Sequence, residues 1–201
     1  MKTTLKEIWS KNPCQDGWDK LVEGLGMSEL KELSRNDEAP EDIEVSLRFI
    51  LENNGWDNCK WAFPCVEGYK REFRLLAVAF ARPVEHLTTD KEASRALDVA
   101  EQFANGRATN DELEVVAKAA AAAYDAAYAA ADAETAAAYA AAKAASDAAS
   151  ANPASAAASA ARAAASAADP ACDGRVKAIQ AQISEFKRFL DCIESGERYE
   201  I

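Results

Sequence analysis

The alanine-rich stretch over residues 117–168 constrains the fold more than any other feature, because 34 of its 52 residues are alanine. Alanine loses no side-chain rotamer entropy in a helix and has the highest intrinsic helix propensity. We therefore predict helix wherever proline does not interrupt the stretch. Asn152-Pro153 is such an interruption, because proline disfavours helical geometry in the preceding residue and suits the first position of a new helix.

The stretch should therefore form two helices. The first is predicted over about 110–151, where Thr109 and Glu112 at its start have the spacing of a capping box. At 1.5 Å per residue it would be about 60 Å long. The second is predicted over 153–168. We expect the long helix to fold back on the shorter one.

Within this stretch the sequence repeats every eleven residues, a period that keeps equivalent positions on one stripe of a helix. Tyr124, Tyr128 and Tyr139 occupy that stripe. We interpret them as structural anchors, because a tyrosine buries about 150–250 Å²; the alternative is an exposed recognition stripe. An ice-binding helix of the fish antifreeze type would need a uniform threonine array, which the stripe lacks. A weaker copy of the stripe follows the proline, at Ser155, Ser159 and Ser166.

The rest of the chain has the apolar spacing of short amphipathic helices. They are predicted over 4–10, 13–25, 43–54, 56–63, 69–83 and 89–105, with a final helix over 173–195. Trp18, Trp56 and Trp61 are the candidate anchors of the first part. With no run of alternating β-branched residues, we predict an all-α helical bundle. Its Trp/Leu-rich N-terminal region, 1–106, and its alanine-rich hairpin plus C-terminal helix, 107–201, would share one continuous core.

Composition indicates the cellular compartment in which the protein is expected. No stretch reaches 18 to 20 strongly apolar residues, and the start lacks the apolar segment of a signal peptide. A soluble cytoplasmic protein is expected. Five cysteines at irregular spacing indicate reduced thiols. A zinc site using Cys59, Cys65 and His86 is the alternative, although no Cys-x-x-Cys pair supports it.

The net charge of −11 argues against nucleic acid as a direct partner, because phosphate binding needs concentrated lysine and arginine. It favours a protein partner with a basic surface, or simply a solvated acidic exterior. Glu114, Asp125 and Asp147 fall on one line of the eleven-residue repeat. The full candidate contact set is Asp111, Glu112, Glu114, Asp125, Asp132 and Asp147.

The sequence contains no phosphate-binding loop, no dinucleotide-binding glycine motif, no serine-hydrolase elbow and no zinc-protease motif. The chain has one histidine. Glu72 with Arg71 and Arg74 is the cluster closest to a catalytic arrangement, and we interpret it as an ion pair at a helix start. We expect no enzyme, no cofactor and no metal.

Four segments carry a resemblance to a known family: 12–18, 50–57, 71–75 and 96–106, the last leading into the alanine repeats. Together they resemble an alanine-rich protein family of bacteriophages and prophages. The same arrangement is similar to proteins assigned as immunity proteins in bacterial toxin systems.

The resemblance implies an accessory protein that acts by binding. Our first hypothesis is a non-enzymatic inhibitor of a host defence complex, anti-CRISPR or similar, that blocks a basic nucleic-acid-binding surface. The second is an immunity protein that neutralises a bacterial toxin. The third is a structural helical scaffold, which would form a homo-oligomer through the tyrosine stripe.

Overall fold

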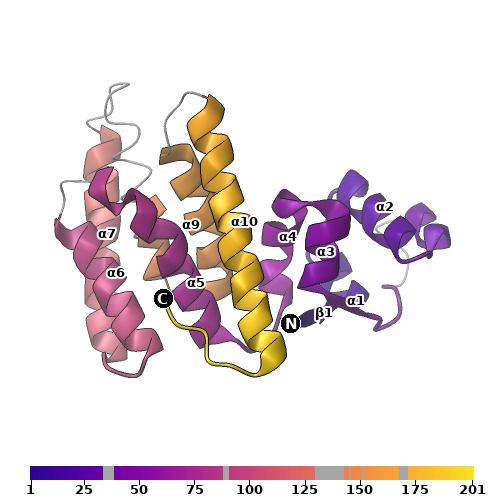
Figure 1. Ribbon diagram of the computed structural model, residues 1–201, viewed down its shortest axis with the longest axis horizontal. Coiled ribbons are helices and arrows are strands. Elements are labelled where there is room, and N and C mark those ends of the chain that lie inside the picture. The colour runs from indigo at the N-terminus through magenta and orange to yellow at the C-terminus, as the bar shows by residue number, and fades with distance from the viewer. Residues whose placement is uncertain (34–38, 88–90, 130–142, 145, 151, 168–171) are drawn as a thin grey trace. The chain divides into compact units, whose positions relative to one another are not determined.

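The computed structural model describes residues 1–33, 39–87, 91–129, 143–144, 146–150, 152–167 and 172–201 (Figure 1). The chain divides into two compact units, Met1–Gly68 and Tyr69–Ile201. Almost all regular structure in the described residues is helical, so the predicted all-α class is confirmed. The boundary drawn from composition at 106 falls inside the second unit. No helix among the described residues is long and apolar enough to cross a membrane.

The first unit contains a small sheet that the sequence did not predict. Strand β1 pairs antiparallel with β2, and Thr3 lies opposite Val45. The predicted helix over 43–54 is therefore wrong in its first turn. Ser46 ends β2 and caps the helix that follows, because its hydroxyl accepts a hydrogen bond from Phe49 N at 3.0 Å. The elements are β1 (Lys2–Thr4), α1 (Leu5–Ser10), α2 (Gln15–Gly24), the 3-10 helix η1 (Ser28–Glu32), β2 (Glu44–Ser46), α3 (Leu47–Asn54), α4 (Trp56–Ala62) and η2 (Phe63–Cys65).

Tryptophans form much of the core of the first unit. The rings of Trp9 and Trp18 lie 4.8 Å apart, and Trp18 Nε1 donates a hydrogen bond to Leu30 O at 2.9 Å. This bond ties η1 to α2. Of the predicted anchors, Trp18 and Trp56 are buried, whereas Trp61 is half-buried.

The second unit is built around helix α5. It packs against α6, α9 and α10, and residues 73–78 are all buried. A helix buried on every side needs neighbours all around it. Figure 1 shows α5 among these helices. The elements are α5 (Lys70–Ala81), the 3-10 helix η3 (Arg82–Leu87), α6 (Lys91–Ala104), α7 (Asn110–Ala129), α9 (Pro153–Ala167) and α10 (Cys172–Ser195).

Helix α9 is the shorter predicted alanine helix, and it begins at Pro153 as expected. Asn152 caps it by accepting a hydrogen bond from Ser155 N at 3.2 Å. Eleven of its 15 residues are buried. The other four lie at helical spacing on one outward stripe: Ser155, Ser159, Arg162 and Ser166. The serine copy of the repeat therefore faces out.

The prediction of one helix over 110–151 is wrong. Lys143 Nζ lies 5.3 Å from the centre of the Tyr124 ring. Nineteen residues of continuous helix would separate the two by about 28 Å. Residues 130–142, including Tyr139, lie outside the described residues, and the side chain of Tyr128 is not described either. Tyr124 itself is half-buried.

The two alanine-rich helices also pack differently from the predicted hairpin. Helix α7 packs mainly against α6, while α9 packs mainly against α5 and then α10. Alanine faces accept any neighbour that fits closely, so composition alone does not choose the partner. Gln182 of α10 shows how close the approach is, because its amide donates to Ala161 O of α9 at 2.8 Å.

Arg74 of α5 is buried, with 4% of its surface exposed. Its guanidinium donates to Ala148 O at 3.2 Å and to Ser150 O at 2.8 Å, and it lies 5.2 Å from the Phe103 ring. Burial lowers the pKa of Arg74. A cation on the last carbonyls of a helical segment is favourable. Arg74 therefore fixes residues 148–150 onto α5.

The last residues fold back onto α10. Tyr199 is 1% exposed, and its hydroxyl donates to Glu185 Oε1 at 2.5 Å while its ring meets Phe189 edge-on at 5.0 Å. On α10, Val176 is 46% exposed. Its buried face carries Phe186, Phe189 and Leu190.

Replacing Arg74 by methionine should destabilise the second unit by about 2–4 kcal/mol, because a buried carbonyl and a half-buried one lose their donor. Urea unfolding followed by far-ultraviolet circular dichroism measures this. All four tryptophans lie in the first unit, so their fluorescence reports that unit separately. Exposed Arg95→Met is the matched control, with a change below about 0.5 kcal/mol. Equal stability of the two variants would contradict the role of Arg74.

Glu185 should make the second unit acid-sensitive. Burial would raise its pKa, but hydrogen bonds from Arg188 and Tyr199 outweigh burial and hold the pKa below 4.5. A depressed folded pKa gives stability that is present above the unfolded pKa and is lost as pH falls through the folded one. The free energy of unfolding, measured between about pH 6 and pH 3, should fall less for Glu185→Gln than for the wild type. The exposed control variant Glu197→Gln should lose as much stability as the wild type when the pH falls.

Candidate functional site

Four of the six residues of the acidic contact set predicted from the sequence lie on α7. Asp111, Glu112, Glu114 and Asp125 are all exposed. Glu112 completes the predicted capping box, because Thr109 N donates to its carboxylate at 2.7 Å and Glu112 N donates to Thr109 Oγ1 at 3.2 Å. Asp132 lies outside the described residues.

Asp147 differs from the other members of the set. It is half-buried, and Lys143 Nζ lies 3.1 Å from its carboxylate. Burial raises the pKa of Asp147, an effect that Lys143 and Arg162 oppose. Because 110–151 is not one helix, Asp147 does not continue a line from Glu114 and Asp125. The exposed part of the predicted line is therefore the part on α7.

The outward side of α7 is a stripe that we call the α7 face: Asp111, Glu114, Val115, Lys118, Ala122 and Asp125. All six are exposed and follow helical spacing, while Leu113, Val116 and Ala120 point into the unit. Val115 is 58% exposed. Lys118 pairs with Glu114 at 2.6 Å. The α7 face thus combines an apolar centre with carboxylates around it.

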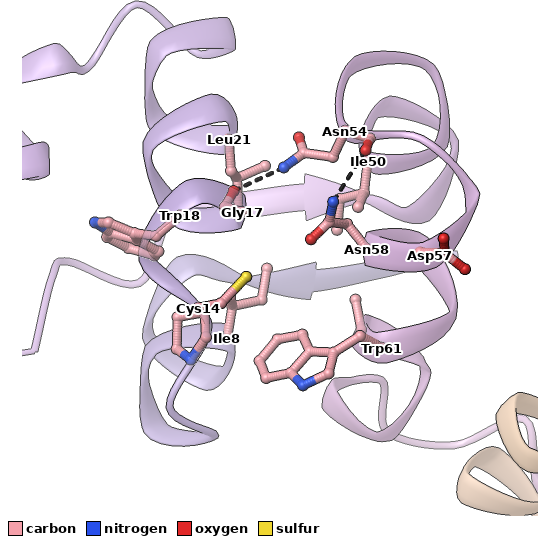
Figure 2. A pocket seen from close by; sticks show the side chains of 12 residues that line it. Ile8, Cys14, Gly17, Trp18, Leu21, Ile50, Asn54, Asp57, Asn58 and Trp61 are labelled. Atoms are coloured by element: carbon pink, nitrogen blue, oxygen red, sulfur yellow. Dashed lines mark hydrogen bonds between the residues drawn. The ribbon is translucent and has the colours of Figure 1, made fainter.

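A second candidate site is an apolar pocket of about 200 Å³ in the first unit (Figure 2). Helices α2 and α4 form its two walls. Trp18, Leu21 and Cys14 line one wall and Trp61 lines the other, as Figure 2 shows. Ile8 and Ile50 complete the apolar lining.

A glycine and two asparagines hold these walls together. A Cβ at Gly17 would lie 2.6 Å from Asn58 Oδ1, so α2 and α4 approach closely only because residue 17 has no side chain. Asn54 Nδ2 donates to Gly17 O at 2.7 Å, and Asn58 Nδ2 donates to Asn54 O at 3.0 Å. The second bond fixes Asn58 so that its Oδ1 turns toward the pocket in Figure 2.

One thiol and one carboxylate lie at the edge of the pocket. Cys14 is exposed and carries a free thiol. Asp57 is held by Lys60 at 2.9 Å, with 94% of its side chain exposed. Figure 2 shows this carboxylate on the outer side of α4, turned away from Trp18.

The residues of the zinc alternative do not form a ligand set. Cys59 and Cys65 are buried, and burial raises the pKa of the Cys65 thiol to about 11 and that of Cys59 further. A raised pKa opposes the thiolate that zinc binds. His86 is exposed on η3, in the other unit. In the ranges that the structure describes, no group of three or more His, Cys, Asp or Glu side chains could hold a metal ion.

The cluster of Arg71, Glu72 and Arg74 at the start of α5 has structural partners. Arg71 Nη1 lies 3.4 Å from Glu72 and donates to Tyr199 O at 3.0 Å, and its Nη2 donates to Asn105 Oδ1 at 2.7 Å. Arg71 thereby joins α5, the end of α6 and the last residues of the chain.

Sequence reasoning singled out Trp18 and Trp61 only as anchors, and it missed the pocket between them. Segments 12–18 and 50–57 supply most of its lining. A glycine inside an amphipathic helix was the available signal, because it lowers helix propensity unless another group needs the space.

Comparison with known proteins gives no match: no family model, no curated protein and no solved structure is similar to this chain.

Asn54→Ala should destabilise the first unit by about 1–2 kcal/mol, because a part-buried carbonyl of α2 loses its donor. Tryptophan fluorescence during urea unfolding reports this, since all tryptophans are in the first unit. Exposed Glu52→Ala, on the same helix, is the matched control and should change stability by less than about 0.5 kcal/mol. An unchanged midpoint for Asn54→Ala would show that this bond does not hold α3 on α2.

Proposed function

We propose that this protein is a non-enzymatic inhibitor of phage or prophage origin that acts in the host cytoplasm. It binds a host defence complex, anti-CRISPR or similar, and covers a basic surface meant for nucleic acid. The observation that carries the proposal is the α7 face, where exposed carboxylates surround an exposed Val115. An apolar centre with a charged rim is the usual anatomy of a protein interface.

Charge supports this kind of partner. The chain carries 34 acidic and 23 basic side chains. A surface that binds DNA or RNA carries concentrated lysine and arginine. Carboxylates presented on a rigid helix are complementary to such a surface and steer the encounter with it.

The immunity hypothesis rests on the same chemistry, because a nuclease toxin also presents a basic nucleic-acid site. An activity assay in cells distinguishes the anti-defence hypothesis from the immunity hypothesis. An anti-defence protein restores phage plating on a host that carries the defence system. An immunity protein instead restores growth of cells that express the toxin.

The scaffold hypothesis requires a tyrosine stripe that is free to join copies. In the described part of that stripe, Lys143 lies over the Tyr124 ring. The α7 face therefore suits a partner of opposite charge better than a second copy of the same acidic helix.

The double variant Glu114→Lys and Asp125→Lys should weaken binding to the defence complex by about 10-fold at low salt, because two favourable charge pairs become repulsive. Phage plating on the defended host should fall with it, and added salt should reduce the difference. Glu52→Lys with Glu197→Lys changes the net charge equally at exposed sites off α7 and should keep wild-type activity. Equal loss in both double variants would show that net charge matters and the α7 face does not.

A further inference from the structure

The pocket in the first unit has the size and lining of a site for one aromatic side chain. Its volume is about 200 Å³. Sites for drug-sized ligands usually reach about 300–1,000 Å³, whereas an apolar cavity of about 150 Å³ already accepts benzene. Trp18, Leu21 and Trp61 provide apolar contacts on two sides.

One polar atom in the pocket selects the kind of ring. Asn58 Nδ2 is used by Asn54 O, and within the described chain Asn58 Oδ1 accepts no hydrogen bond. Figure 2 shows this oxygen turned toward the space between α2 and Trp61. A ring that enters there gains a hydrogen bond if it carries a polar hydrogen, as the indole of tryptophan and the phenol of tyrosine do.

The charge of the first unit indicates which residues should flank that ring in the partner. Residues 1–68 carry 14 acidic and 8 basic side chains, so more than half of the net negative charge lies in one third of the chain. Asp57 keeps its carboxylate exposed at the pocket edge. A segment with lysine or arginine beside the ring is complementary to this surface, and an acidic segment is not.

We propose that this pocket binds a tryptophan or tyrosine side chain from a basic segment of the partner protein, with Asn58 Oδ1 as its hydrogen-bond acceptor. The inference deepens the proposed function and rests on it for the identity of the partner. A buried aromatic anchor of this kind is a typical hot spot of a protein interface. The α7 face would then steer the encounter, and the pocket would hold the complex.

Blocked pentapeptides of the form Lys-Lys-X-Lys-Lys test the pocket on the full chain, with X tryptophan, tyrosine, phenylalanine or alanine. Nuclear magnetic resonance of the four tryptophan indole groups reports binding. Trp18 and Trp61 line the pocket, whereas Trp56 does not and serves as the internal control. The Trp61 signal should shift saturably with the tryptophan and tyrosine peptides. The phenylalanine peptide should bind about 3- to 10-fold more weakly, because Asn58 then lacks a donor.

Cys14 offers a blocking variant at the pocket edge. It caps α2 without a side-chain hydrogen bond and is exposed, so substitution there spares the fold. Cys14→Trp should fill the pocket edge and abolish peptide binding, while Gln15→Trp, at an exposed position of α2 outside the pocket lining, should keep it. Asn58→Ala should remove the difference between the tryptophan and phenylalanine peptides. Circular dichroism checks that each variant is folded.

Three results would overturn the inference: an unmoved Trp61 signal, equal binding to Cys14→Trp, or equal binding of Glu-Glu-Trp-Glu-Glu. The phage plating assay distinguishes failure of this inference about the pocket from failure of the proposed function. If Cys14→Trp protects phage as well as the wild type, the partner does not use the pocket, and the proposed function stands. If the wild type protects no phage but still binds the lysine-tryptophan peptide, the anti-defence function is wrong and the pocket is not.

Discussion

The second unit depends on how closely α9 approaches its neighbours α5 and α10. Each alanine buries little area, so the stabilisation comes from short distances between helices rather than from large side chains. Helix α10 lies close enough to α9 for Gln182 to donate to Ala161 O. Arg74 of α5 reaches Ala148 O and Ser150 O, in the segment just before α9. A larger side chain at a buried alanine of α9 would push the helices apart and break such backbone contacts together with the packing.

The alanine stretch therefore has a different structural role from the one expected from composition. From composition it is expected to organise the chain, with its two helices paired. In the structure the central helix is α5, which is rich in phenylalanine and leucine, and α9 forms part of its covering. The outward stripe of α9 carries serine and Arg162 because the other faces have no room for anything larger than alanine.

Sequence reasoning succeeds where the determinant is local. The break at Asn152-Pro153, the capping box of Thr109 and Glu112, and the end of the last helix at Gly196 all depend on neighbouring residues, and each was predicted. The continuity of 110–151 was predicted wrongly, since helix propensity says nothing about a contact between Tyr124 and Lys143. The two short strands were missed for the same reason: pairing of Thr3 with Val45 is set by the tertiary structure.

The pocket shows the same limit at the level of function. Asn53-Asn54-Gly55 is typical of a helix end, and α3 does end there. The sequence does not show that Asn54 also donates to Gly17 O, because helical periodicity relates positions a few residues apart and these are 37 apart. Gly17 could be identified as unusual in a helix, but the group that needs its space, Asn58, appears only in the structure.

The α7 face and the pocket would contribute to binding in different ways. Exposed carboxylates such as Asp125 act over about a Debye length and mainly change the rate of encounter, so added salt weakens their effect. An apolar pocket excludes water and acts at contact distance, so it mainly slows dissociation and depends little on salt. A protein that must find a basic surface ahead of nucleic acid needs the first property, and one that must stay bound needs the second. The salt dependence of the association and dissociation rates therefore separates the contribution of the α7 face from that of the pocket.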